Sequence, residues 1–304
     1  MPHFADRLAD DARRRGTPLC VGLDPRWDSL PAAVRRRHGG RTAEEVAAAY
    51  EEFCGRVLDV VAPLVAVVKP QAAFFEACGP EGMAVLQRLL RKARGLGLLT
   101  IFDGKRNDIA STATAYADAA LRGSPVGDRV FPVWDADALT VNAYLGRDAI
   151  EPFLNSARRM GAGVFVLVRT SNPGAGLFQD LRCEGKPLYR HVGDAVASWT
   201  RENLGACGLG DVGAVVGATY PAEMTELRQA LPEVIFLVPG YGVQGGKAAD
   251  VAGAFRADGS GAIVSSSRGL LFPFRPDEAN WETAVKKEAH AAIAALAPFS
   301  RSGR

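Results

Sequence analysis

Eight short apolar runs alternate with stretches of helical period along this chain of 304 residues. The runs are continuous rather than alternating in hydrophobicity, which is typical of strands that are buried on both faces. They cover residues 19–23, 65–68, 98–102, 138–141, 164–168, 212–216, 234–238 and 262–264. Repeated strand–helix units without a break in composition predict parallel strands joined by right-handed crossovers. Eight such units favour an α/β fold of the (β/α)8 TIM-barrel type over an open doubly wound sheet.

The stretches between the runs carry helix signals. Thr42 and Glu45 have the spacing of a capping box, and Val46, Tyr50 and Phe53 follow at helical spacing. Further helices are expected at residues 81–94, 108–121, 147–160, 187–204, 221–230, 248–255 and 277–297. We expect a single domain over residues 1–304, with a core from about residue 17 to residue 297, a short N-terminal helix and a C-terminal tail.

Composition narrows the choice of partners and location. The chain has 36 basic and 34 acidic residues, a net charge of +2, which favours neither a nucleic acid nor a membrane as partner. Its five cysteines show no C-x-x-C spacing, which indicates a reducing compartment and mostly buried thiols. The four histidines lack metal-ligand spacing, so we expect no bound metal. Residues 1–16 lack the apolar segment of a secretory signal, and we expect a cytoplasmic location.

The densest group of charged residues follows the third apolar run. Asp103 and Lys105 are two positions apart at a strand end, so the period of two should point both side chains towards the barrel axis. Asp108 lies where the next helix should begin, and Lys69 ends the second strand. Each residue alone could be a solvated strand end or a helix cap. Together they indicate a catalytic site, because crowding charges at a barrel mouth is unfavourable and such clusters are found mainly at functional sites.

A family resemblance becomes specific at this point. The motif Asp-x-Lys-x-x-Asp-Ile-x-x-Thr at residues 103–112, with Lys69 on the preceding strand, resembles the signature of the orotidine monophosphate decarboxylases. Residues 67–76, 168–175 and 238–246 resemble the longer bacterial branch of that family. The resemblance implies a lyase that converts orotidine 5′-monophosphate to UMP with loss of CO₂, the last step of de novo UMP biosynthesis. It implies no cofactor.

The resemblance also implies roles for the charged residues. Lys105 is the cation that stabilises a carbanion at C6 of the pyrimidine and then protonates it. Asp103 and Asp108 keep Lys105 charged and oriented, and Lys69 completes the alternating network.

The same resemblance implies a homodimer. In the family, the residue that matches Asp108 enters the active site of the other subunit, with the residues that match Ile109 and Thr112 beside it. We therefore expect each active site to be shared between two chains.

A phosphate site is expected after strands seven and eight. Residues 240–245 match G-x-G-x-x-G, which after a first strand would indicate dinucleotide binding. Here the segment follows the seventh strand, where barrels bind phosphate. The resemblance implies that Gln244 and Arg268 bind the 5′-phosphate of the substrate. The alternative for Arg268 is a surface salt bridge.

Two further residues face the expected barrel mouth. Asp24 ends strand one and resembles the family residue that accepts hydrogen bonds from ribose hydroxyls; alternatively, it is a turn residue before Pro25. Ser171 matches the family serine that contacts the pyrimidine; alternatively, it is a solvated loop hydroxyl. It lies in the long, glycine-containing segment 170–186, and loops of that length in a compact domain are usually functional.

Two rival functions remain. A magnesium-dependent sister group, the keto-gulonate-phosphate decarboxylases and hexulose-phosphate synthases, resembles this chain at strand three but holds its metal through an acid at the end of strand two. Lys69 occupies that position here and disfavours a cation. The other rival is a catalytically dead barrel that binds nucleotides, which the intact set of charged residues disfavours.

Overall fold

Eight parallel strands form a closed barrel in the computed structural model, which describes residues 2–242 and 247–300. Around the barrel the strands run in the order β1-β12-β11-β10-β7-β6-β3-β2. Their bounds are β1 (Leu19–Leu23), β2 (Val67–Pro70), β3 (Leu99–Arg106), β6 (Ala138–Val141), β7 (Gly163–Arg169), β10 (Val212–Val216), β11 (Phe236–Val238) and β12 (Ala262–Ser266). Each overlaps one of the expected apolar runs. The expectation of a (β/α)8 barrel is confirmed.

The barrel wall explains why the apolar runs are continuous. In β1, Cys20 belongs to the cluster of side chains inside the barrel, whereas Leu19 and Val21 belong to the cluster between the strands and the surrounding helices. Successive residues of a strand point to opposite faces, so a strand covered on both sides needs apolar residues at every position. Strand positions that would carry polar residues in a sheet with one exposed face are therefore apolar and buried here.

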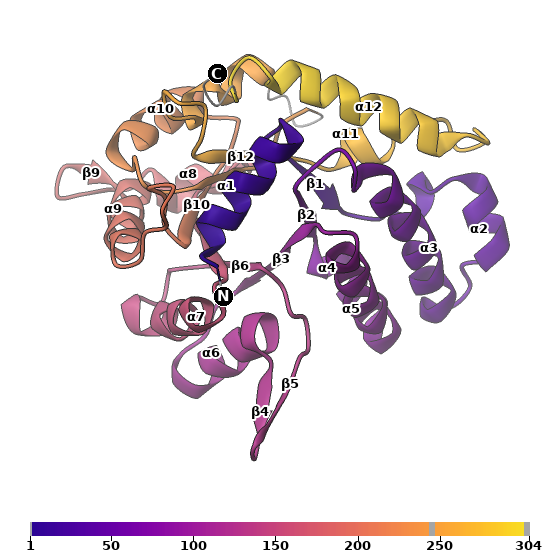
Figure 1. The fold of residues 1–304 in the computed structure, drawn as a ribbon, viewed down its shortest axis with the longest axis horizontal. Helices are drawn as coiled ribbons and strands as arrows, with labels where there is room; N and C mark the ends of the chain where they lie inside the picture. The colour runs from indigo at the N-terminus through magenta and orange to yellow at the C-terminus, as the bar shows by residue number, and fades with distance from the viewer. Residues whose placement is uncertain (1, 243–246, 301–304) are drawn as a thin grey trace.

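Helices surround the strands (Figure 1). The larger ones are α3 (Ala43–Val61), α5 (Gly79–Gly95), α6 (Ala110–Ala117), α7 (Arg147–Met160), α9 (Leu188–Arg201), α10 (Pro221–Ala230) and α12 (Trp281–Leu296). Shorter helices are α2 (Ala32–His38), α4 (Ala72–Glu76), α8 (Gly176–Gln179) and α11 (Arg268–Leu271). Both α7 and α10 have the bounds that the sequence predicts.

Several local expectations differ from the structure. The helix expected at residues 108–121 begins at Ala110 and ends in a π-helical turn, η2 (Asp118–Arg122). The helix expected at 248–255 is a 3₁₀ helix, η4 (Ala248–Ala254). The capping box is half formed: Thr42 accepts from the backbone of Glu45, but the Glu45 carboxylate accepts from the backbone N–H of Arg41, at 2.6 Å.

Two β-hairpins lie outside the barrel wall and were not predicted. One pairs β4 (Ser124–Val126) with β5 (Arg129–Phe131) and projects away from the barrel beside α6 (Figure 1). The other pairs β8 (Arg182–Cys183) with β9 (Lys186–Pro187) in the long segment before α9. Both are too short for a periodic pattern to reveal them.

The N-terminal helix α1 (Phe4–Arg15) crosses one end of the barrel (Figure 1). Phe4 inserts into the interior and meets Phe165 edge to face, with ring centroids 6.0 Å apart. A Cβ at Gly163 would lie 2.3 Å from the Phe4 ring, so a residue without a side chain lets the ring enter. Arg7 ties the helix down through an ion pair of 2.6 Å with Asp137. The end of the barrel opposite the expected active site is therefore closed.

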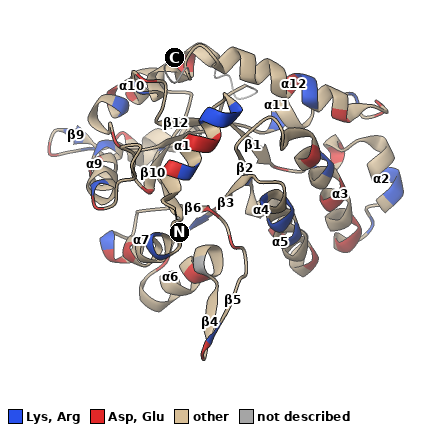
Figure 2. Cartoon of the chain, viewed as in Figure 1, with Lys and Arg blue, Asp and Glu red and all other residues tan. Residues whose placement is uncertain are grey.

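The molecular surface carries both charge signs. Lys and Arg are interspersed with Asp and Glu over the outer helices (Figure 2). None of the described helices combines the length and apolarity that crossing a bilayer would require. All five cysteines fall within the described residues and are free thiols, three of them buried.

Candidate active site

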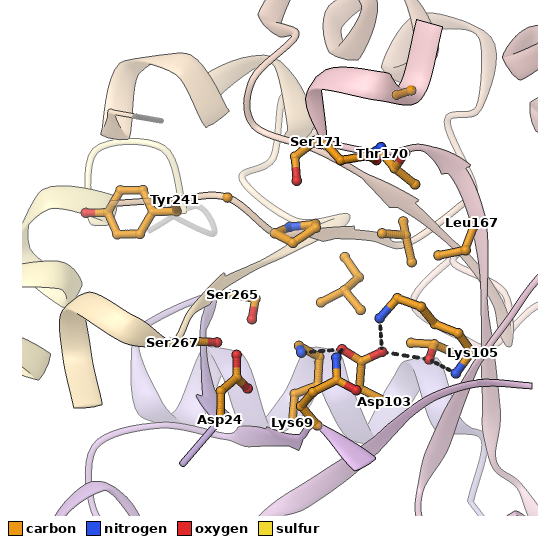
Figure 3. A pocket seen from close by; sticks show the side chains of 18 of the residues that line it. Asp24, Lys69, Asp103, Lys105, Leu167, Thr170, Ser171, Tyr241, Ser265 and Ser267 are labelled. Atoms are coloured by element: carbon orange, nitrogen blue, oxygen red, sulfur yellow. Dashed lines mark hydrogen bonds and ion pairs between the residues drawn. The ribbon is translucent and has the colours of Figure 1, made fainter. Parts of the chain in front are cut away.

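The carboxyl ends of the strands surround a cavity of about 560 Å³. Six of the residues singled out in the sequence line it: Asp24, Lys69, Asp103, Lys105, Ser171 and Arg268. They come from β2, β3 and the segments that follow β1, β7 and β12, so the barrel brings together residues far apart in sequence. Figure 3 shows the charged residues at the base of the cavity, with Ser171 on the opposite side.

Asp103 is the centre of the charged cluster. Lys69 Nζ donates to its Oδ2 at 2.5 Å, and Lys105 Nζ donates to its Oδ1 at 2.7 Å (Figure 3). The side chains of Asp103 and Lys69 are 6% and 7% exposed, whereas that of Lys105 is 46% exposed. One lysine is thus buried against the carboxylate, and the other lines the cavity with its side chain half-exposed.

Two neutral side chains complete the surroundings of the carboxylate. Thr140 on β6 donates its hydroxyl to Asp103 Oδ1 at 2.8 Å and accepts from the backbone N–H of Lys105 at 2.9 Å. Gln71 donates its amide to Asp103 Oδ2 at 3.1 Å. Sequence reasoning missed both residues. Their positions could have indicated a role, because Thr140 lies near the end of β6 and Gln71 just beyond the end of β2, the two strands next to β3.

The backbone at Lys105 departs from regular strand geometry. Its φ is +43°, in the left-handed region, and the pairing of β3 with β6 shifts register between Phe102 and Arg106. The period of two of a regular strand therefore does not extend to Lys105, although its side chain still meets Asp103. A left-handed residue other than glycine is strained, and such strain is often found at functional sites.

Electrostatics hold the cluster in its charged form. Burial alone would raise the pKa of Asp103, but the adjacent charges of Lys69 and Lys105 outweigh it and keep this pKa well below its usual range. Burial alone would lower the pKa of Lys69, but the negative charges of Asp103 and Asp24 leave it above its usual value. The pair is therefore an ammonium–carboxylate pair at neutral pH.

Asp24 lines the cavity and has one buried acceptor. Among the described residues, no hydrogen-bond donor meets its buried Oδ1. The carboxylate lies beside Ser267 (Figure 3), and a Cβ at Gly22 would lie 1.9 Å from the Ser267 hydroxyl, which shows how closely these segments approach. Buried acceptors without partners are uncommon, and this one belongs to a residue that lines the cavity.

The other walls of the cavity come from loops. Ser171 lies in the long segment after β7, where Gln179 accepts from the backbone N–H of Thr170 at 3.0 Å and donates to its hydroxyl at 2.7 Å. Arg268 begins α11 and lines the cavity together with Tyr241. Gln244, expected to bind phosphate, lies outside the described residues.

Three expected site residues lie away from the cavity of their own chain. Asp108, Ile109 and Thr112 are not among the described residues that line it. Asp108 precedes the helix instead of beginning it, and its carboxylate accepts from the backbone N–H of Ile109 at 2.8 Å. The Ile109 side chain is 54% exposed, and Thr112 is exposed as well. This segment is available to another molecule.

A model of the orotidine 5′-phosphate decarboxylase / HUMPS family matches residues 17–279. The chain belongs to this family. It is 51% identical over 293 residues to the orotidine 5′-phosphate decarboxylase of Rhodopirellula baltica, covering 94% of this chain and 96% of that protein. It is 39% identical over 278 residues to the enzyme of the same name from Caldicellulosiruptor bescii, covering 90% and 91%.

Structural similarity agrees with the family assignment. The OMP decarboxylase of Leishmania donovani superposes with a TM-score of 0.74 at 35% identity, over 97% of this chain and 98% of that one. The range that matches the family model contains all eight barrel strands and every residue of the charged cluster.

Replacement of Asp103 tests the electrostatics of the cluster. Asp103→Asn leaves two ammonium groups without their shared carboxylate, so we expect a loss of about 3 kcal/mol in unfolding free energy at pH 7. The folded-state pKa of Asp103 is depressed, so its contribution is present above the unfolded value of about 3.9 and is lost as pH falls through the folded value. In urea unfolding from pH 7 to pH 3, the difference between the two proteins should therefore stay full down to about pH 4 and only begin to narrow below it.

The matched control is Asp59→Asn, which removes an exposed ion pair with Lys92. Its N–O distance of 2.7 Å equals that between Lys105 and Asp103. That change should alter the unfolding free energy by less than about 1 kcal/mol at any pH. Equal effects of the two substitutions would contradict the electrostatic account of Asp103.

Proposed function

We propose that this chain decarboxylates orotidine 5′-monophosphate to UMP. The observation that carries the proposal is the half-exposed ammonium of Lys105, held by a buried carboxylate at the base of a cavity that also contains an arginine. Two relatives, 51% and 39% identical over most of the chain, are named orotidine 5′-phosphate decarboxylase. The proposed product is the one expected of the last step of de novo UMP biosynthesis.

The chemistry needs a positioned cation. When the bond between C6 and the carboxylate breaks, the electron pair remains on C6 and CO₂ leaves. A preorganised positive charge stabilises that anion at little reorganisation cost, because it is already in place. Lys105 supplies the charge and then transfers a proton from Nζ to C6, which gives UMP. Asp103 keeps Lys105 oriented, and its own anchorage by Lys69 and Thr140 keeps the carboxylate still.

The remaining residues bind the ends of the substrate. Arg268 offers a planar guanidinium to the 5′-phosphate, and Gln244 is proposed beside it from the family resemblance. The carboxylate of Asp24, which lines the cavity, accepts from a ribose hydroxyl. Ser171 contacts the pyrimidine from the loop side, and the apolar side chains of Leu167, Val215 and Leu237 line the cavity between these groups.

The magnesium-dependent sister chemistry is the second candidate, since the family model also covers that branch. At the end of β2 its members need an acidic ligand. Here that position holds the Lys69 ammonium, 2.5 Å from the carboxylate of Asp103. A cation at this point would repel a divalent metal, which favours the cofactor-independent reaction.

We further propose a homodimer in which Asp108 reaches the site of the partner. Exposed apolar side chains accompany it just before and on α6, on the hairpin β4–β5 and after β6: Ile109, Tyr116, Val126, Val130, Phe131, Tyr144 and Leu145. Exposed apolar groups on neighbouring elements are typical of an interface. A second copy of the chain would bury these side chains. Asp108, Ile109 and Thr112 of each chain would then lie against the cavity of the other chain. The proposed location is the cytoplasm.

The first test is direct turnover. Purified protein should remove the absorbance of the orotate chromophore from orotidine 5′-monophosphate without added metal, and EDTA should leave the rate unchanged. Turnover that requires Mg²⁺ would indicate the sister chemistry. Binding of UMP without any turnover would indicate a catalytically dead barrel.

Arg268 tests the phosphate end. Arg268→Ala should lower kcat/KM for orotidine 5′-monophosphate by about 100-fold, because it removes a charge-assisted contact to the phosphate. The same substitution should hardly change turnover of orotidine, which lacks the phosphate. Comparable losses with the two substrates would contradict a phosphate role for Arg268.

Sharing of sites is tested by mixing two inactive variants. Asp108→Ala and Lys105→Ala should each abolish activity, but a heterodimer would contain one site with both residues intact. Activity should therefore return on mixing after subunit exchange, at about half of the wild-type value per heterodimer. Failure to recover activity, with heterodimers shown by mass spectrometry, would mean that Asp108 acts within its own chain or not at all.

A further inference from the structure

A fully buried arginine lies directly behind the loop side of the cavity. Arg169 is the last residue of β7, and 2% of it is exposed. Its guanidinium stands 3.9 Å from the ring centroid of Tyr220 and 5.2 Å from that of Tyr189. A guanidinium in such surroundings is unfavourable without a close carboxylate, because burial removes its hydration.

The close carboxylate comes from the segment that covers the cavity. Arg169 Nη1 lies 2.7 Å from Oδ1 of Asp180, the residue that follows α8, whereas Glu223 on α10 is 3.9 Å away. Asp180 is itself 53% exposed, so solvent alone could satisfy it. The buried partner therefore gains more from the pair than the exposed one does, and the pair fixes α8 to the barrel.

The neighbouring residue makes the same connection. Gln179 Oε1 lies 3.5 Å from Arg169 Nη1 and accepts from the backbone N–H of Thr170. Gln179 and Phe178 both line the cavity, as does Ser171. One guanidinium thus sets the position of several residues that face a bound nucleotide, although Arg169 is not among the residues lining the cavity.

The backbone leaves room for this arrangement. Gly176 has an ordinary helical φ of −60°, yet a Cβ there would lie 2.6 Å from Oδ2 of Asp180. On the barrel side, the backbone N–H of Gly217 donates to the carbonyl of Arg169 at 2.7 Å, and a Cβ on Gly217 would lie 2.8 Å from that of Ser171. The backbone of Arg169 is therefore held by the barrel while its side chain holds α8.

We infer that Arg169 is a positioning residue that holds α8 and the adjoining loop over the cavity, so that the nucleotide meets a preformed wall. The inference rests on the proposed function for its effect on turnover, but the anchoring itself does not depend on it. Loss of the guanidinium would leave α8 to sample positions in which Phe178 and Gln179 do not face the ligand. Apparent affinity falls in proportion to the population of the competent arrangement.

The test compares Arg169→Met, Asp180→Asn and the double variant. Amide hydrogen exchange over residues 176–181 should become about tenfold faster in each, with exchange in the barrel strands unchanged. UMP should bind about tenfold more weakly, and kcat/KM should fall at least as much. Because both substitutions break one interaction, the double variant should resemble Arg169→Met alone. Arg169→Lys should recover part of the affinity, since it keeps the charge but loses the planar fork.

The matched control is Arg190→Met on α9. Arg190 is also largely buried, but its partners are Glu226 on α10 at 2.6 Å and Asp194 on α9 at 3.7 Å, and neither belongs to α8. It should change neither the exchange of residues 176–181 nor UMP binding. Asp180→Asn alters an exposed residue, so it keeps the test valid if Arg169→Met does not fold.

Two results would overturn the inference. One is unchanged exchange over residues 176–181 in Asp180→Asn. The other is loss of global stability in Arg169→Met with UMP affinity per folded molecule unchanged. Failure of the proposed function looks different: wild-type protein would not turn over orotidine 5′-monophosphate, while the exchange measurement would still report whether Arg169 anchors α8.

Discussion

The carboxylate of Asp103 holds two ammonium groups of different accessibility, and the site depends on that arrangement. A buried carboxylate is stable when opposite charges and hydrogen bonds replace its hydration. Lys69 supplies a permanent counter-charge, and the Thr140 hydroxyl and Gln71 amide bind the remaining lone pairs. Lys105 is then held by a group that cannot move away, yet its side chain remains half-exposed. A cation fixed in this way is what a reaction that develops negative charge requires.

The two ends of the barrel differ in polarity, and this difference places the charged residues at one of them. At one end, α1 inserts Phe4 among apolar side chains and excludes water. At the other, the inward-facing positions of β2 and β3 change from apolar to charged two residues further along: Val67 is followed by Lys69, and Ile101 by Asp103. The same alternation that builds the core therefore places charges around the mouth, and the loops after β7 and β12 complete the walls.

The strands and the charged cluster could be predicted, because each leaves a local pattern. Continuous apolar runs mark strands buried on both sides, and charges at the ends of β2 and β3 meet because parallel strands end at one edge. Other features depend on distant contacts. The left-handed φ of Lys105 accompanies a register shift between β3 and β6, and the sequence of neither strand indicates that shift by itself. The roles of Thr140 and Gln71 were missed because neutral side chains are common and acquire meaning only beside Asp103.

The position of α1 bears on how the chain reaches its final form. Phe4 is synthesised long before its ring partner Phe165 on β7. The helix is short, and isolated helices of that length are marginal in water. Helix α1 therefore gains its docking site only once β7 has been made and placed in the barrel.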